Sequence, residues 1–490
     1  MSDTRNRYRA VALCLVLTAL AFASSGCALL LHKDTDPKPM VGHERIRLAE
    51  DIRLARDSWP EAGWWLRFED TQLSDLVVKA LLDSPGMDVA RARTEAAKAK
   101  IGAAVSNAGP LVGAMGMINR MRVSDAGFLG IYAEDIPLLG IHGPWYTTAT
   151  VGLTGSWNLD IWGKDRAMIR ATVGEANAQA AEQAQAELVL AGGVARLYFD
   201  IQALHSLLDL LEQIRAVEAE MTAASQERVK RGLEPRSTYE QARLRQLDLE
   251  EQVSNAQNDL RAFHEALRAI VGQPDLPPLE RAGLPATQGR MPQTLGYELL
   301  ARRPDLQAAR WYVQASLDAV DAVKAAFYPS FNLLGFYGFD SMDATWLFNR
   351  GAQQIMFTPM VTLPIFDSGR LNAALREART SSDMLIALYN EAVLNAVRDV
   401  ALAGIRMQKI EAGLAIQEER LHSAAYLFES VNAYKKRGLA DAVEAMAARL
   451  PLLAEQVRAL ELRRLHLMAD IDLIQALGGG YRQEPPAPEK

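Results

Sequence analysis

The side chains most able to do chemistry are scattered along the 490-residue chain. No histidine falls in an HExxH or Cys/His metal-binding spacing, and neither a phosphate-binding loop nor a nucleophile elbow occurs. The LGGGY sequence at 477–481 follows a helical pattern, so it favours a helix end over a phosphate loop. We therefore expect no enzyme, no cofactor and no metal site. The seven histidines are His32, His43, His142, His205, His264, His422 and His466, and we expect His205, His264 and His422 on helix surfaces.

One side chain, Cys27, has a clear chemical expectation. It follows three early arginines, an apolar run over 10–23 and the small residues SSG, which is typical of a lipoprotein signal. This pattern predicts a signal peptide over 1–26, a lipid on Cys27 and a lipidated linker over 27–60. The alternative is an uncleaved membrane anchor over 11–31. The other cysteine, Cys14, would leave with the signal, so an exported chain would form no disulfide within itself.

The composition limits the class of partner. Hydrophobic residues make up 49% of the chain and charged residues 23%, which is enough for a large core. The net charge is -7, and basic residues alternate with acidic ones instead of forming blocks. We expect no nucleic-acid partner.

Two long stretches without proline, 145–234 and 365–450, predict very long helices. Over 166–230 good helix formers dominate, and apolar residues from Val194 to Leu211 recur at spacings of 3 and 4, the pattern of a coiled coil. A helix of that length would extend about 98 Å. Each expected long helix ends in the tripeptide Arg-Gly-Leu, at 231–233 and 437–439, where glycine is expected to end the helix in a left-handed conformation. We expect each tripeptide to form the tip of a helical hairpin.

Alternating sequences come before each long helix. From Thr147 to Ile161 the odd positions are mostly apolar and the even ones mostly small and polar, which predicts a strand with one lipid face and one polar face. Weaker candidates are 111–120, 330–340 and 355–366, and aromatic residues cluster around them. A soluble sheet with an aromatic core is the alternative.

The chain is thus a tandem repeat in which each half contains a helix, two strands, a long helix, a tip and a return helix. We expect the first repeat over 61–271, a linker over 272–293, the second repeat over 294–480 and a disordered tail over 481–490. Four strands cannot close a barrel, and an open sheet edge in lipid leaves backbone groups unsatisfied. We therefore expect a homotrimer with twelve strands.

Several motifs are similar to the outer-membrane efflux lipoproteins of the TolC family, in particular the NodT-like branch. They are WWLRFEDTQL (64–73), RRPDLQAARW (302–311), KAAFYPSF (324–331), LPIFDSGRL (363–371) and IQALGGGY (474–481). The resemblance covers almost all of the mature chain. It implies a mainly α fold with a membrane β-barrel portion, namely a trimeric twelve-stranded outer-membrane barrel continued by a periplasmic α-helical barrel.

The resemblance also implies partners and sites. The channel would dock through a periplasmic adaptor onto an inner-membrane pump of the RND type and conduct small molecules outward. The implied adaptor contacts are the two tips: Arg231, Gly232, Leu233, Arg437, Gly438 and Leu439. The implied periplasmic gate consists of Tyr434, Arg437, Asp441 and Glu444. A solvated, charged helix end is the alternative for the gate, and a periplasmic coiled-coil adaptor or scaffold without a pore is the alternative function.

Overall fold

The computed structural model describes residues 36–42, 55–57, 59–133, 135–136, 141–287, 290–292 and 296–482. The predicted signal peptide and Cys27 lie outside the described residues. Two compact units make up the chain, one containing residues 1–39, 95–177 and 311–387, the other 40–94, 178–310 and 388–490. Each unit takes segments from both halves of the sequence, because strands and helices of the two halves pack with one another.

The same order of helices and strands occurs twice. The first half contains α2 (Thr71–Asp83), α3 (Pro85–Ala108), β2 (Leu111–Arg122), β5 (Trp145–Leu159), α4 (Lys164–Lys230) and α5 (Arg236–Val271). The second half contains α6 (Gly296–Arg302), α7 (Pro304–Ala325), β7 (Ser330–Ser341), β8 (Gln353–Thr362), α8 (Arg370–Lys436) and α9 (Ala442–Ala476). The internal repeat is therefore present in the fold. The two long helices, α4 and α8, each have 67 residues.

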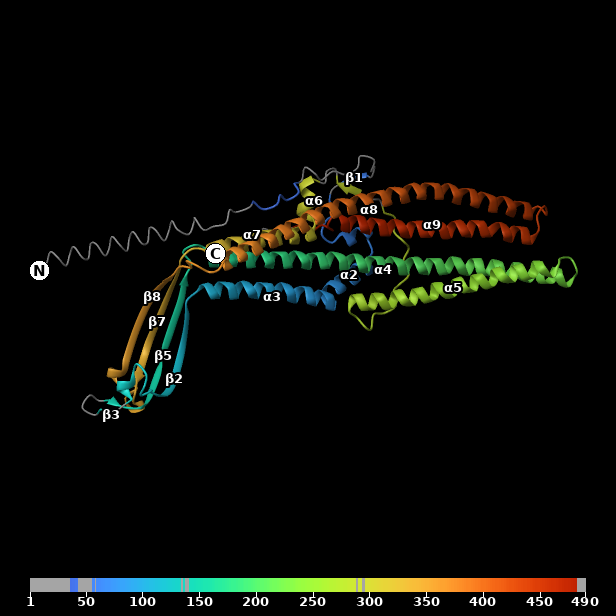
Figure 1. Cartoon of the computed structure of the whole chain (residues 1–490). Helices are drawn as coiled ribbons and strands as arrows, with labels where there is room; N and C mark the ends of the chain where they lie inside the picture. The colour runs from blue at the N-terminus through green and yellow to red at the C-terminus, as the bar shows by residue number, and fades with distance from the viewer. Residues whose placement is uncertain are drawn as a thin grey trace. The chain divides into compact units, whose positions relative to one another are not determined.

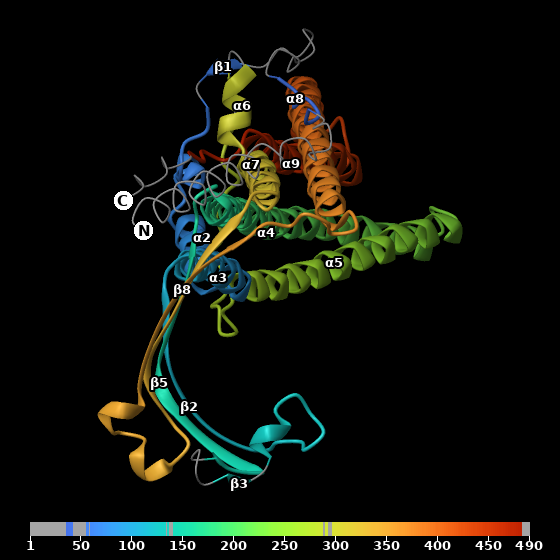
Figure 2. The same ribbon diagram turned by 60° about the vertical axis from the view of Figure 1, so that its left-hand side comes forward.

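The first unit contains an antiparallel sheet in the order β2-β5-β7-β8 (Figures 1 and 2). All four predicted strands are confirmed, although β8 ends at Thr362 and not at Phe366. The sequence 363–369 turns into α8, and Pro364 removes a backbone donor just where the strand stops. Pro359 lies inside β8, which is the outer strand of the sheet within one chain.

Two pairs of short strands have no signal in the sequence. β1 (Ala55–Asp57) runs parallel to β6 (Arg290–Pro292) in the second unit, and β3 (Asp135–Ile136) pairs with β4 (Ile141–His142) between β2 and β5. Two or three residues are too few to display an alternating pattern. As a result, part of the region predicted as a plain linker is a strand.

The core of the second unit packs α2 against α4, α5 and α9. Its most buried members come from all four helices: Leu73, Val77, Val194, Phe199, Ile201, Leu267, Leu467 and Ile471. Val194 and Ile201 belong to the predicted coiled-coil stripe of α4, and Met407 of α8 is also buried. The polar side chain of Gln417 in α8 is buried and donates to the backbone oxygen of Glu455 at 2.9 Å. Its burial is therefore compensated by a hydrogen bond.

Candidate functional site

The tip of the first hairpin is a Schellman motif. Leu233 N–H donates to the carbonyl of Arg228 at 2.9 Å, and Gly232 N–H donates to that of Val229 at 2.9 Å. Gly232 has a φ of 72°, the left-handed conformation predicted for it. This conformation ends α4 and turns the chain toward α5.

The second tip repeats this geometry. Leu439 N–H donates to the carbonyl of Tyr434 at 2.9 Å, Gly438 N–H donates to that of Lys435 at 3.0 Å, and Gly438 has a φ of 74°. A Cβ on either tip glycine would meet nothing within 4 Å, so only the backbone angle requires glycine. The repeated tripeptide therefore produces the same turn twice.

Both tip leucines are exposed to the same degree. Leu233 and Leu439 each keep 71% of their surface accessible. A Leu at this position commonly packs back on its own helix. With this exposure, the two leucines bury little surface in such a contact. Each hairpin thus presents an apolar side chain at its end.

The two tips are joined by an arginine that sequence reasoning missed. Arg228 Nη2 lies 2.8 Å from Asp441 Oδ2, and Arg228 Nη1 lies 3.1 Å from Glu234 Oε1. No local pattern could identify this pair, since its members belong to different repeats. The only signal is that Arg228 comes one helical turn before the glycine of its own tip.

The predicted gate residues are brought together only in part. Asp441 and Glu444 form a capping box at the start of α9, with each side chain accepting from the other's backbone N–H at 2.7 and 2.9 Å. The hydrogen bond from Glu444 N–H and the guanidinium of Arg228 hold the pKa of Asp441 below its usual value. Tyr434 is exposed on the last turn of α8, and Arg437 is exposed in the turn that follows this helix. The capping box fits a solvated helix end, whereas the contact with Arg228 adds a link between hairpins.

The register of the sheet aligns the two predicted faces. Ile355 lies opposite Tyr337, Tyr337 opposite Leu153 and Leu153 opposite Ala114, so the odd face of β5 continues across all four strands. On the other face Thr150 donates to Asp340 Oδ1 at 2.7 Å. That face is polar on β5 but also carries methionines from the two edge strands: Met115, Met117, Met121, Met356 and Met360. The sheet therefore has one apolar face and one mixed face rich in hydroxyl groups.

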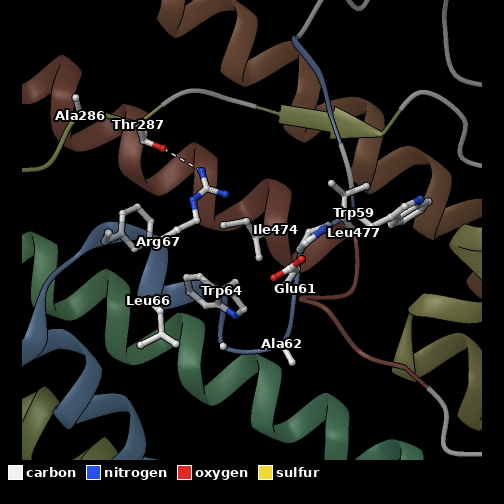
Figure 3. A pocket seen from close by; sticks show the side chains of 13 residues that line it. Trp59, Glu61, Ala62, Trp64, Leu66, Arg67, Ala286, Thr287, Ile474 and Leu477 are labelled. Atoms are coloured by element: carbon white, nitrogen blue, oxygen red, sulfur yellow. Dashed lines mark hydrogen bonds between the residues drawn. The ribbon is translucent and has the colours of Figure 1, made fainter.

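A pocket of about 810 Å³ lies in the second unit, between the segment 59–68, the linker and α9 (Figure 3). Arg67 Nη2 lies 2.5 Å from Asp470 Oδ2 and donates to Thr287 Oγ1 at 3.1 Å. Burial raises the pKa of Asp470, and the charge of Arg67 opposes that rise. These contacts tie three distant segments together, which is a structural role.

A second polar cluster lies between α4 and α5. The rings of His205 and His264 are 6.3 Å apart and half-buried, so the prediction of surface positions is wrong for this pair, whereas His422 is exposed. Neither ring nitrogen of His205 has a hydrogen-bond partner among the described residues. Burial, then Arg281 and His264, lower the pKa of His205, and burial followed by Arg268 lowers that of His264.

In the part of the chain that the structure describes, no three His, Cys, Asp or Glu side chains are grouped so as to hold a metal ion. No described helix is long and apolar enough to cross a membrane.

The sequence matches the family described as "Outer membrane efflux protein" over residues 76–273 and 295–479. The multidrug resistance outer membrane protein MdtP of Escherichia coli O6:H1 is 43% identical over 475 residues, which cover 96% of this chain and 97% of MdtP. MdtQ of the same organism, a multidrug resistance outer membrane protein, is 38% identical over 429 residues, covering 87% of this chain and 90% of MdtQ.

Solved structures share the fold. The outer membrane protein VceC of Vibrio cholerae superposes with a TM-score of 0.76 at 27% identity, covering 86% of this chain and all of VceC. The Campylobacter jejuni CmeC outer membrane channel gives a TM-score of 0.80 at 19% identity over 93% of this chain and 95% of CmeC. These matches confirm the predicted fold class and the resemblance on which it was based. With a family match over most of its length, the chain belongs to the outer membrane efflux protein family.

Proposed function

We propose that the chain is the outer-membrane channel of a tripartite efflux system and conducts small molecules passively, without catalysis. Its relatives are named for multidrug resistance, so drugs and similar toxic compounds are the proposed cargo. The main support for this proposal is the four-stranded sheet, whose register aligns an apolar face across every strand. Such a face suits lipid, and the opposite face, where the hydroxyl groups of β5 lie among methionines of β2 and β8, is the proposed lining of a water-filled lumen.

Homotrimerisation follows from the edges of this sheet. β2 and β8 are its two outer strands, and each offers a row of backbone groups to another strand. Within lipid these groups require partners, because no water is present to satisfy them. Pairing β8 of one copy with β2 of the next in three copies gives a closed barrel of twelve strands.

The long helices support the same assembly. One side of α8 carries exposed apolar side chains that no described part of the chain covers, among them Met384, Leu388, Leu402, Ile405 and Ile416. Exposed large apolar residues that recur on one side of a helix are typical of an interface between helices. Neighbouring copies would cover this side and form a periplasmic helical barrel.

We assign the tip residues Arg231, Gly232, Leu233, Arg437, Gly438 and Leu439 to adaptor contact. Two exposed leucines held by identical turns offer repeated apolar anchors of the kind that carry binding energy. The adaptor would connect the channel to an inner-membrane pump of the RND type. The link between Arg228 and Asp441 is the proposed fastening of the periplasmic end, with Tyr434, Arg437 and Glu444 around it.

A lipid on Cys27 would anchor the N-terminus in the outer membrane. The repeat boundaries 61–271 and 294–480, with the linker 272–293 between them, remain predictions.

The decisive experiment measures assembly and conductance on one preparation of the full chain. The protein purified in detergent is expected to migrate as a heat-resistant trimer and to give discrete conductance steps in a planar bilayer. A coiled-coil adaptor without a pore would bind partners through its hairpins but give no such steps. A trimer without conductance under any applied voltage, even after opening variants at Arg228, would contradict the proposed function.

A further inference from the structure

Two arginines end the apolar face of the edge strand β2. Val112, Ala114, Gly116 and Ile118 lie on this face, and Arg120 and Arg122 follow at the next two positions of the same alternation. Ile118 is 80% exposed, so the arginines adjoin open apolar surface. Two guanidinium groups at the border of such a surface are stabilised by an anionic neighbour, because charged groups beside apolar surface are poorly solvated.

Trp145 lies beside this pair. It is directly opposite Arg122 in the sheet, and the guanidinium of Arg120 lies 5.4 Å from the centre of its ring. Arg122 Nη2 also lies 3.3 Å from Asp125 Oδ2, an exposed carboxylate in the loop that follows β2. The stacking on Trp145 orients one guanidinium, while Asp125 neutralises part of the charge of the other.

The two tryptophans of this face mark a membrane-sized interval. Trp145 and Trp157 lie on the same face at opposite ends of β5. At about 3.3 Å per residue they are about 40 Å apart along the strand. With the usual tilt of about 40° this spans about 30 Å of depth, close to the thickness of the hydrocarbon core. Trp145 then marks one border of the lipid, and Arg120 and Arg122 lie at that border.

The topology decides which border this is. β2 follows α3 and β5 precedes α4, so the helices join the sheet at the Trp157 end, whereas the loop 123–144 joins β2 and β5 at the Trp145 end. In an outer-membrane channel with periplasmic helices, the loop end faces the cell exterior. This step rests on the proposed function.

We propose that Arg120 and Arg122 form a binding site for the phosphate group of an outer-leaflet lipid. Arginine binds phosphate oxygens through paired N–H donors, and at the membrane border its side chain reaches the headgroup level without a large penalty. Ile118 and Trp145 provide apolar contact for the acyl region beneath the phosphate. A free phosphate ion would gain nothing from that apolar surface, which is why the site is assigned to a lipid.

The test compares retained lipid in matched variants of the full-length trimer. Arg120→Gln/Arg122→Gln removes both charges, and Arg350→Gln removes one from the exposed loop between β7 and β8 at the same end of the sheet. Diphosphorylated lipid A, monophosphoryl lipid A and inorganic phosphate serve as probes. We expect the glutamine pair to lower the lipid A co-purified per chain, measured by mass spectrometry, at least about fivefold. The pair should also lose the rise in Tm that diphosphorylated lipid A gives the unaltered protein.

The Arg350→Gln variant should retain lipid A as the unaltered chain does, and Arg120→Lys/Arg122→Lys should retain more than half of it because the charge remains. Equal retention by the glutamine pair, or equal loss in Arg350→Gln, would overturn the proposal. Protection by inorganic phosphate as strong as by lipid A would also overturn it, in favour of a free-anion site. Conductance and trimer formation should be unchanged in the glutamine pair, so a failure here is distinct from a failure of the channel function.

Discussion

Arg228 Nη2 and Asp441 Oδ2 lie 2.8 Å apart and join the tips of the two helical hairpins within one chain. Arg228 is held by Glu234 of its own tip, and Asp441 is the N-cap of α9. Both side chains are thus positioned before they meet, which lowers the entropy lost in forming the pair. Because the hairpin ends carry the proposed gate, this pair is the most direct place to test it.

We expect Arg228→Gln and Asp441→Asn each to raise the channel's open probability. The pair is exposed to solvent, so the expected increase is about two- to fivefold, the range for a single surface ion pair. Asn can still cap α9, which separates loss of the pair from loss of the helix cap. Single-channel recording in planar bilayers measures the effect. Arg236→Gln, which breaks the surface pair with Glu240 within α5, is the matched control and should leave conductance unchanged.

The same pair predicts a pH dependence. The pKa of Asp441 is lowered in the folded chain, so the contact is present above the ordinary carboxyl pKa and is lost as pH falls through the folded value. Open probability should therefore be flat between pH 5 and 8 as far as this pair is concerned, and should rise only below about pH 4. A rise centred near pH 6 would exclude Asp441 as its cause.

Leu233→Asp with Leu439→Asp is expected to abolish export and adaptor cross-linking while trimer yield and Tm stay as in the unaltered chain. Both side chains are exposed at turns whose geometry depends on glycine, so we expect them to contribute little to the stability of the hairpins. Leu233→Met with Leu439→Met preserves the apolar contact and is the control. A double aspartate variant that no longer assembles would show that the leucines hold the hairpins and do not dock a partner.

Leu153→Arg should reduce insertion and trimer yield far more than Thr154→Arg. Leu153 belongs to the apolar face and Thr154 to the other face of β5. A lipid-facing arginine near mid-membrane costs about 2 to 4 kcal/mol, whereas one in a lumen remains hydrated. Heat-resistant trimer in outer-membrane fractions is the measurement. Equal losses in the two variants would argue for a soluble sheet.

The pair formed by His205 and His264 should make the second unit less stable in acid. The folded-state pKa of each lies below its ordinary value, so the unfolded chain binds protons more readily and stability falls as pH drops from about 6.5 through the folded values. Arg281 and Arg268 reinforce this direction, while Asp209 and Glu265 oppose it. We expect a lower Tm at pH 5.5 than at 7.5, and a smaller difference in His205→Leu. His422→Leu, which alters an exposed histidine of α8, is the control.

Cys27→Ser should abolish labelling of the chain by fatty acids and lower its amount in the outer membrane, since each buried CH₂ of a lipid chain contributes about 0.8 kcal/mol to attachment. Conductance of the protein that still inserts should be normal. Unchanged labelling would favour the uncleaved anchor over 11–31.

Much of the fold could be predicted because long patterns carry it. The fifteen residues of β5 and the 67 residues of α4 repeat their periods many times, and the glycine at each tip has a single backbone reason to be there. β1 and β6 could not be predicted, because three residues display no period. The partnership of Arg228 with Asp441 could not be predicted either, since it depends on how two hairpins pack. The contacts of Arg120 with Trp145 likewise required the register of β2 against β5.

The strand order also determines when during synthesis the sheet can form. β5 ends at Leu159 and pairs with β7, which begins only at Ser330, so α4, α5, the linker, α6 and α7 are synthesised between these two neighbours. Contacts so distant in sequence form slowly. Until they form, the incomplete sheet exposes unpaired strand edges that are prone to aggregation. The first helical hairpin, α4 and α5, has local contacts and can form before the sheet is complete. The sheet therefore stays incomplete until β8, its last strand in the sequence, has been synthesised.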